Sequence, residues 1–357
     1  MTTKDGVAKL VSRLRLCPGA QHYDFAMALT LATLKRYCDP SKLKPYNSAH
    51  EVFLFGGVDP YRSEGISRQF LSDASVYHER YFKPSHFGML LERAFECADF
   101  PIDSYQELNV LDLGSGSGNT VIPLASRNRS LKLVATDLSI DLLRILATLV
   151  RDKEYSDQIG FICADANRKT FYDGVFDLVV GAYILHHLID PAKVLTNALA
   201  CLKPGGLAVF FEPFEYGCNL MKDLYLLVLD EPRCQDGLHP DVVAHFKAII
   251  RDYNARFDLE NVKPFTKDLD DKWLFTKRFF ADICGRNGCR LVELRNNKDE
   301  ALAQAFTDQL LENLKLSGLG HHPLPGWMLE ICGEFDQHVD VSLKRRLVLD
   351  GTAVIRK

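Results

Sequence analysis

The sequence predicts an α/β protein in which a mostly parallel sheet carries helices on both faces. Short apolar strands alternate with amphipathic helical segments between residues 110 and 211, the pattern expected of consecutive strand–helix–strand units. A glycine-rich turn follows the first of these strands. An acidic residue also stands at or just after the end of four strands. In a parallel sheet those strand ends meet at one edge, where ligands bind.

The first strand and the turn after it form the central motif. Val110–Leu113 is apolar, has no helical period and ends at a glycine, which indicates a buried strand. Gly114, Gly116 and Gly118 let the backbone turn sharply and lie bare against a ligand, and a helical pattern begins directly afterwards. The three glycines alone would be equally consistent with a flexible loop. Together with the strand and the helix N-terminus they predict a nucleotide-binding corner.

The remaining core elements follow in order. Further strands are predicted at Leu131–Ala135, Ile159–Cys163, Phe176–Val180 and Leu207–Phe211. Ser139 can cap the helix after the second strand, and Asp190 followed by Pro191 is a typical start for a later one. Both helices carry apolar residues at three- and four-residue spacing. The turn formed by residues 203–206 ends the later helix.

Four carboxylates mark the ends of strands: Asp112, Asp137, Asp165 and Glu212. Any one of them alone would be interpreted as a helix cap or a solvated turn residue. At one edge of a sheet, each could accept hydrogen bonds from a different part of one ligand, such as an ammonium group, a ribose diol or the amino group of adenine. Their placement therefore predicts a ligand site.

A nicotinamide-dinucleotide site is an alternative for this corner. That motif seats a pyrophosphate in G-x-G-x-x-G and places an acid about 20 residues later, a role that Asp137 would fill. The third glycine comes one residue early, however, and Asn119 occupies its expected place. An acid at Asp112 also suits a ligand with a positive group and opposes a pyrophosphate. The sequence thus disfavours a nicotinamide oxidoreductase.

With these motifs in this order, the sequence resembles the class I S-adenosylmethionine-dependent methyltransferases. The matching segments are Val110–Gly118, Ala135–Asp137, Cys163–Asp165, Phe176–Leu188 and Leu202–Leu207. Gly288–Arg295 and Arg346–Arg356 look like the closing antiparallel strands of that family. The resemblance implies a Rossmann-like, seven-stranded, mostly parallel sheet, methyl transfer, and S-adenosylmethionine as the cofactor.

The resemblance also implies which residues hold the cofactor. Asp112 would face the methionine ammonium, Asp137 would bind both ribose hydroxyls and Asp165 would bind the adenine amino group, while Leu138 would stack on the adenine. No metal is implied. The full implied set is Asp112, Gly114, Ser115, Gly116, Asp137, Leu138, Asp165, Ala166, Gly181 and Ala182.

Candidates for contact with the methyl acceptor follow the fourth and fifth strands. They are Tyr183, His186, His187, Glu212, Glu215 and Tyr216. A histidine near His187 is common in the family among members with no shared substrate, which favours a structural or lining role there and leaves His186 as the candidate base. Glu212 could orient an acceptor or cap the next segment. A base is needed only if the acceptor must lose a proton early, because alignment with the sulfonium provides much of the rate by itself.

The rest of the chain is expected to surround this domain. Residues 1–105 are predicted to be a helical extension that either caps the ligand site or forms a homodimer contact. Residues 106–357 would form the cofactor-binding domain, with lid insertions at about 215–271 and 297–343. Helices in the extension are predicted at Ala26–Leu34, about Ile66–Phe82 and His86–Cys97.

Composition narrows the functional classes. The 357 residues are 47% hydrophobic and 25% charged, with a net charge of −4, so no global attraction to nucleic acid or anionic lipid is expected. No apolar run reaches membrane-spanning length and the N-terminus lacks a signal-peptide core. The ten cysteines form no C-x-x-C pair or zinc-finger spacing, which favours free thiols and a cytoplasmic location. We expect an enzyme acting on a small-molecule acceptor. A non-catalytic protein that keeps the cofactor fold is the second alternative.

Overall fold

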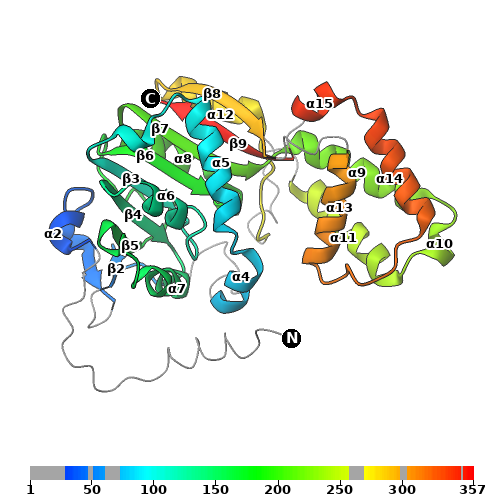
Figure 1. The fold of residues 1–357 in the computed structure, drawn as a ribbon, viewed down its shortest axis with the longest axis horizontal. Coiled ribbons are helices and arrows are strands. Elements are labelled where there is room, and N and C mark those ends of the chain that lie inside the picture. Colours follow the sequence, from blue (N-terminus) through cyan, green and yellow to red (C-terminus); the bar gives the residue numbers. More distant parts are fainter. Residues whose placement is uncertain (1–28, 47–50, 61–72, 257–268, 298–303, 347–348) are drawn as a thin grey trace, which may run out of the picture.

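The computed structural model describes residues 29–46, 51–60, 73–256, 269–297, 304–346 and 349–357. Its centre is one nine-stranded sheet with the order β1-β2-β5-β4-β3-β6-β7-β9-β8 (Figure 1). The strands are β1 Leu43–Pro45, β2 Val52–Phe55, β3 Leu108–Leu113, β4 Leu131–Asp137, β5 Ile159–Cys163, β6 Phe176–Ala182, β7 Leu202–Pro213, β8 Arg290–Asn296 and β9 Asp350–Arg356.

Six neighbouring strands, from β2 to β7, run parallel. The three remaining pairings, β1–β2, β7–β9 and β8–β9, are antiparallel. Every residue of β3 is buried, including Asn109 and Asp112, because a central parallel strand is covered on both faces. The predicted α/β class and mostly parallel sheet are confirmed.

Helices cover both faces of the sheet. On one face, α5 (Pro84–Cys97), α6 (Val121–Arg127) and α7 (Ile140–Val150) pack against the sheet in one apolar core. On the other face, α2 (Leu31–Leu34), α8 (Pro191–Cys201) and α12 (Lys277–Arg286) form a second core. Ser139 caps α7 and Asp190 caps α8 through their side chains, as their positions predicted.

The sheet has two strands more than the seven expected, and both come from the extension that was predicted to be helical. Val52–Phe55 is a four-residue apolar run that is largely buried and pairs in parallel with β5. Such a short run carries no period of its own, so only its pairing reveals it as a strand. The described part of the predicted Ala26–Leu34 helix is the single turn α2. The helix expected at about Ile66–Phe82 appears as α4 (Ala74–Tyr81), and residues 61–72 lie outside the described chain.

The turn expected at residues 203–206 also differs from the prediction, because it lies inside β7. There the pairing of β7 with β6 shifts register, and Gly205 has a φ of +78°. A residue with positive φ inside a strand is typical of a bulge, where glycine is favoured. The bulge lets one strand run from Leu202 to Pro213 and carry Glu212 to the edge of the sheet.

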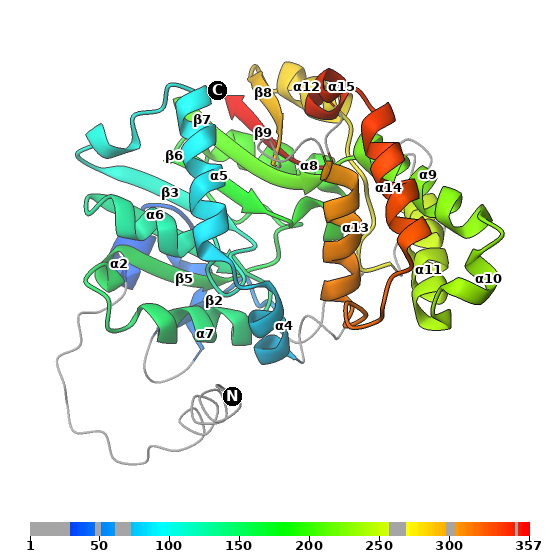
Figure 2. The same ribbon diagram turned by 45° about the vertical axis from the view of Figure 1, so that its right-hand side comes forward.

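A separate helical body stands beside the sheet (Figure 2). Its apolar core is formed by α9, α11, α13 and α14, so the two inserted segments fold together rather than separately. Among the described helices, none is both long and apolar enough to cross a bilayer. The helices of the body are α9 Glu215–Asp230, α10 Cys234–Gly237, α11 Pro240–Arg256, α13 Ala305–Leu316, α14 Gly326–His338 and α15 Val341–Arg346.

Tyr37 fastens the N-terminal segment to the sheet. Its buried hydroxyl donates a hydrogen bond to Asn109 Oδ1 at 2.6 Å, and its ring stacks on Phe176 with 5.0 Å between centroids. We expect Tyr37→Phe to lower the free energy of unfolding by about 1 kcal/mol, since it removes one buried hydrogen bond and keeps the packing. Urea denaturation measures this, with Tyr172→Phe on an exposed tyrosine as the control. Equal losses in the two variants would contradict the assigned role of the hydroxyl.

Candidate active site

A cavity opens at the carboxyl ends of β3, β4, β5 and β6. Because these strands are parallel, the loops that follow them meet at one edge of the sheet. The residues that line the cavity are Tyr77, Gly114, Gly116, Thr136, Asp137, Leu138, Ser139, Leu142, Ala164, Asp165, Ala166, Ala182, Tyr183, Ile184, His187 and Leu188.

The glycine turn brings bare backbone to the cavity wall. Gly114 and Gly116 have φ values of +68° and +52°, a region that favours glycine. A Cβ on Gly114 would lie 2.7 Å from the Ile184 side chain, so the packing there requires glycine. A Cβ on Gly116 would meet nothing within 4 Å, which leaves open space beside its backbone for a ligand.

Asp137 joins the glycine turn to the end of β4. Its Oδ2 accepts a hydrogen bond from the Gly116 N–H at 2.8 Å, and its Oδ1 accepts one from the Ser139 N–H at 2.7 Å. Burial raises the pKa of the Asp137 carboxyl, although the N–H donors act in the opposite direction. Each carboxylate oxygen has two lone pairs, so Asp137 retains capacity to accept further hydrogen bonds on the cavity wall.

Asp165 occupies the corresponding position after β5. Its Oδ1 accepts hydrogen bonds from the Asn167 N–H and the Asn167 side-chain amide, both at 2.9 Å. These bonds fix the turn and hold the carboxylate on the wall, beside Ala164 and Ala166. The structure therefore brings Asp137 and Asp165 together as the strand pattern predicted.

Asp112 lies beneath the glycine turn and is not part of the cavity lining. Its side chain is buried, and its Oδ2 accepts a hydrogen bond from the Thr120 hydroxyl. Burial raises its pKa to about 7. Within the described part of the chain, its Oδ1 is buried with no hydrogen-bond partner. Ser115 and Gly181 likewise lie behind the wall: Ser115 is buried, and a Cβ on Gly181 would meet Phe210.

The turn after β6 has a strained backbone. Tyr183 has a φ of +54°, which is unusual for a residue that is not glycine. Its ring packs edge-on against Phe87, with 6.0 Å between centroids. Burial raises the pKa of its hydroxyl well above the ordinary value. Backbone strain of this kind persists only where the surroundings enforce it, and it often marks functional sites.

Glu212 holds the same turn in place through hydrogen bonds to its backbone. It is fully buried, and its Oε1 accepts hydrogen bonds from the N–H groups of Ile184 at 3.1 Å and Leu185 at 2.7 Å. Its Oε2 lies 2.7 Å from Nδ1 of His186. Since Glu212 is not part of the cavity lining, it is placed to fix the turn η4 (Leu185–His187) rather than to contact an acceptor.

His186 is enclosed between two carboxylates. Nδ1 faces Glu212, and Nε2 lies 3.5 Å from Asp271 Oδ1. Burial lowers the pKa of His186, but Glu212 and Asp271 together outweigh it and raise the pKa to about 9. At neutral pH the ring is therefore an imidazolium, which has no lone pair to accept a proton. The prediction that favoured His186 as a base does not fit this environment.

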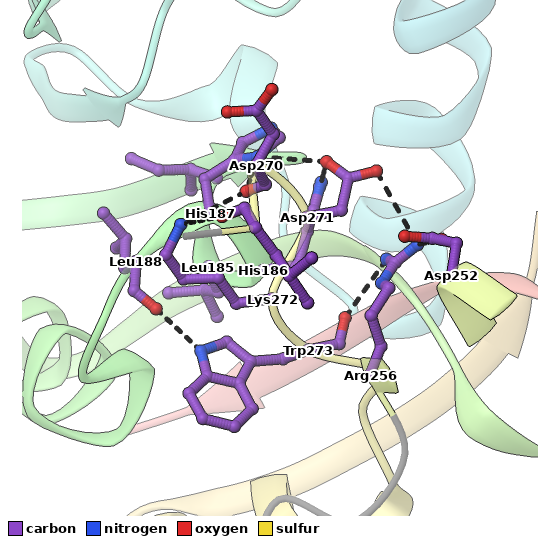
Figure 3. A network of polar contacts seen from close by, with 12 residues as sticks. Leu185, His186, His187, Leu188, Asp252, Arg256, Asp270, Asp271, Lys272 and Trp273 are labelled. Carbon is purple, nitrogen blue, oxygen red and sulfur yellow. Dashed lines mark hydrogen bonds and ion pairs between the residues drawn. The ribbon is translucent and has the colours of Figure 1, made fainter. Parts of the chain in front are cut away.

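His187, in contrast, lies on the cavity wall. Its Nδ1 is 3.0 Å from the Asp270 carbonyl oxygen and 3.2 Å from Asp271 Oδ1 (Figure 3). Burial and the neighbouring charge of His186 lower the pKa of His187. The two adjacent histidines thus have opposite protonation states at neutral pH, with His186 charged and His187 neutral.

Asp271 was not predicted as a site residue. It follows the segment 257–268, carries no recognisable motif, and lies close to both histidines (Figure 3). Arg256 Nη1 lies 3.6 Å from Asp271 and 3.0 Å from Asp252. Only the folded arrangement reveals the network, since its members are far apart in sequence.

Two groups of described side chains have ligand atoms within 4.8 Å of one another, close enough to share a metal ion. They are His186, His187 and Asp271, and, on the helical body, His239, Asp241 and His322. In the first group, Arg256 and the imidazolium of His186 already supply positive charge to Asp271. That arrangement satisfies the carboxylate without a metal.

Comparison with known proteins identifies the central domain. Residues 110–206 match the family model described as a methyltransferase domain. The chain contains a class I S-adenosylmethionine-dependent methyltransferase domain. S-adenosylmethionine is the cofactor of this domain, and the site fits it: two carboxylates and bare glycine backbone line the cavity, and a buried carboxylate oxygen of Asp112 lacks a partner among the described residues.

Three curated relatives each match about a third of this chain. The ubiquinone/menaquinone biosynthesis C-methyltransferase UbiE of Rickettsia prowazekii is 31% identical over 121 residues, which is 33% of this chain and 49% of the relative. A demethylmenaquinone methyltransferase of Paenarthrobacter aurescens is 32% identical, covering 32% of this chain and 43% of the relative. The tRNA 5-carboxymethoxyuridine methyltransferase of Escherichia coli is also 32% identical, covering 29% and 39%. The chain thus spans about half or less of the length of these relatives.

Solved structures resemble the chain only distantly. Geranyl diphosphate C-methyltransferase from Streptomyces coelicolor A3(2) has a TM-score of 0.43 at 10% identity, covering 74% of this chain and 75% of that protein. Phosphoethanolamine N-methyltransferase 2 of Haemonchus contortus has a TM-score of 0.46 at 16% identity, covering 85% and 60%. Neither likeness carries an argument about function.

The charge of His186 predicts how stability depends on pH. A histidine whose pKa rises from 6.5 to about 9 on folding contributes stability that is complete below pH 6.5 and is lost as the pH rises through 9. We expect this group to lower the free energy of unfolding by about 3 kcal/mol between pH 6.5 and 9.5, in addition to the loss near pH 9 from buried thiols such as Cys38 and Cys163, whose pKa values burial raises to about 12. Urea titrations at several pH values test this, with His186→Gln as the comparison. The variant should be less stable at pH 6.5 and should lose about 3 kcal/mol less than the wild type over the same pH range. Equal slopes in the two proteins would contradict a charged His186.

Proposed function

We propose that this chain is an enzyme that transfers a methyl group from S-adenosylmethionine to a small-molecule acceptor. The observation that carries the proposal is the cavity at the carboxyl ends of four parallel strands, where Asp137, Asp165 and the Gly116 backbone meet. The cofactor supplies an electrophilic methyl group on a sulfonium, so the protein mainly has to bind, align and exclude water.

The proposed roles follow from position. Asp137 accepts hydrogen bonds from the ribose hydroxyls, and Asp165 accepts one from the adenine amino group. The glycine turn, from Gly114 to Gly116, receives the methionine and ribose portion. Leu138, Ala166 and Ala182 line the same wall. Asp112, Ser115 and Gly181 support this wall from behind, with Asp112 balancing the methionine ammonium at a distance or through water.

We propose that α4 closes one side of the site as part of the N-terminal cap. His78 Nδ1 lies 2.8 Å from the Ser117 hydroxyl in the glycine turn, and Asn119 in the same turn accepts a hydrogen bond from the Lys83 N–H at 2.7 Å. Tyr77, which precedes His78 in α4, lines the cavity. A helix bound directly to the cofactor loop would exclude water when the cofactor is in place.

We further propose that the helical body serves as the lid on the acceptor side. Arg80 of α4 donates a hydrogen bond to the Leu316 carbonyl, which joins α4 to α13, and Lys83, directly before α5, has its Nζ 3.4 Å from Glu312 of α13. A site closed by two such elements suits a small acceptor. One relative acts on tRNA, as its name states, but the net charge of −4 here does not favour nucleic acid. A cytoplasmic location stays a prediction, as does the alternative of a homodimer formed through the extension.

The proposal is tested by a methyl-transfer assay on a panel of hydroquinones, phenols and amines, reading the release of S-adenosylhomocysteine. Hydroquinones enter the panel because curated relatives act in quinone biosynthesis. Product formation with one compound class supports an enzyme. Binding of S-adenosylhomocysteine without transfer to any class would favour a non-catalytic protein on the same fold. Stabilisation by NAD instead would favour the oxidoreductase alternative.

A further inference from the structure

His187 is placed where an acceptor would meet the cofactor. It comes from the turn after β6, as do Tyr183 and Ile184, and all three line the cavity. Among the described lining residues it is the only imidazole. The carboxylates of the lining, Asp137 and Asp165, stand after β4 and β5, where the adenosine portion is proposed to bind.

The contacts of His187 Nδ1 fix its tautomer. Two groups lie near this nitrogen, the Asp270 carbonyl oxygen and Asp271 Oδ1, and with Asp271 ionised each of them can only accept a hydrogen bond. Nδ1 therefore carries the hydrogen. In a neutral imidazole the lone pair is then on Nε2.

The groups around His187 have opposing effects on its pKa, and they leave the ring neutral at pH 7 and able to accept a proton. The charged groups that face it are His186 on its own turn and Asp271 on the segment before α12, while Arg256 from α11 faces Asp271. Burial and His186 lower the pKa of His187, and Asp271 acts in the opposite direction. A carboxylate on one nitrogen with the lone pair on the other is the arrangement of an oriented general base.

Asp271 belongs to a strap, residues 270–273, that crosses η4 (Figure 3). The strap is held to the turn by a hydrogen bond from the Lys272 N–H to the His186 carbonyl at 2.7 Å, and by one from Trp273 Nε1 to the Leu188 carbonyl at 2.7 Å. Arg256, at the end of α11, donates to the Trp273 carbonyl at 3.2 Å. The orientation of His187 thus depends on how the helical body is docked.

We propose that His187 is the general base of the reaction and that Asp271 is its positioning residue. The inference rests on the proposed function and narrows it to acceptors that carry an acidic proton, such as a hydroxyl group or a C–H acid. The acceptor's proton passes to Nε2. The electron pair left on the acceptor forms the bond to the methyl carbon as the sulfur–carbon bond breaks, its pair staying on sulfur. A tertiary amine or a thioether, which has no proton to lose, is not an acceptor of this site.

The tautomer is measurable in the cofactor-free protein by ¹⁵N–¹H NMR of labelled histidine side chains, with His187→Gln used to assign the signals. We expect wild-type His187 to be neutral and protonated on Nδ1 at pH 7.5. In Asp271→Ala the ring should shift toward a mixture of tautomers. The control Asp282→Ala, on a half-exposed carboxylate of α12, should leave the signals unchanged. A wild-type ring protonated on Nε2, or on both nitrogens, would overturn the proposal.

Kinetics and binding separate this inference from the proposed function. With an acceptor from the panel that bears an acidic proton, His187→Gln should lower kcat by about 100-fold or more. Asp271→Asn should lower kcat by about 10-fold, move the pH profile and leave KM nearly unchanged. Full turnover in His187→Gln, or methylation of tertiary amines alone, would contradict the base while leaving the proposed function standing. Failure of the wild-type protein to bind S-adenosylhomocysteine would instead contradict the proposed function, and the NMR result would not depend on it.

Discussion

Asp137→Ala is expected to weaken binding of S-adenosylhomocysteine by about 100-fold or more. In the proposed complex the ionised carboxylate accepts hydrogen bonds from both ribose hydroxyls, and bonds to a charged acceptor contribute about 1.5 kcal/mol or more each. The variant also releases the Gly116 N–H, which Asp137 now holds at 2.8 Å. Both effects act on the same part of the ligand. Isothermal titration calorimetry measures the affinity directly.

Two control variants make this prediction specific. Asp141→Ala removes a partly exposed carboxylate on the first turn of α7, four residues away, and should leave affinity unchanged. Asp137→Asn keeps the shape and one acceptor oxygen, so its affinity should fall between those of the wild type and Asp137→Ala. If Asp137→Ala keeps its fold by circular dichroism and binds S-adenosylhomocysteine with wild-type affinity, the proposed contact between Asp137 and the ribose is contradicted.

Glu212→Ala is expected to have the largest effect on stability, lowering the free energy of unfolding by about 3–5 kcal/mol. The carboxylate is fully buried and accepts from the N–H groups of Ile184 and Leu185 and from the ring of His186. Its removal leaves three N–H groups, those of Ile184, Leu185 and His186, and an imidazolium without this partner in the interior. Urea denaturation at pH 7 gives the difference.

The matched control is Glu154→Ala, because the Glu154 side chain is 84% exposed and its ion pair with Arg129 is at the surface. Its effect should stay below about 0.5 kcal/mol. Glu212→Gln keeps an acceptor oxygen but not the charge, so it should cost less than Glu212→Ala. A loss below about 1 kcal/mol in Glu212→Ala would show that Glu212 does not organise the turn.

The core of the fold could be predicted because local patterns determine it. Apolar runs such as Val110–Leu113 alternate with amphipathic helices, and this alternation leaves a parallel sheet as the simplest arrangement. Strands β1 and β2 could not be found in this way. They are three and four residues long, and β2 becomes a strand only through its pairing with β5. The assembly of the two inserted segments into one helical body also depends on tertiary packing that no local pattern encodes.

The cofactor side of the site was more predictable than the acceptor side. The ends of parallel strands must meet, so Asp137 and Asp165 could be placed on one wall from sequence alone. His186 and His187 are neighbours in sequence, and nothing in the sequence tells which one is buried between carboxylates. The partner that distinguishes them, Asp271, is more than 80 residues away in the chain. Residues that act across such separations, without a motif, emerge only from the folded structure.

A crystal structure with S-adenosylhomocysteine tests the central claim most directly. The claim predicts the ribose hydroxyls within hydrogen-bond distance of Asp137, the adenine beside Leu138 and Asp165, and the sulfur on the side of the cavity where His187 lies. A ligand bound elsewhere, or one whose ribose points away from Asp137 while this cavity stays empty, would contradict it.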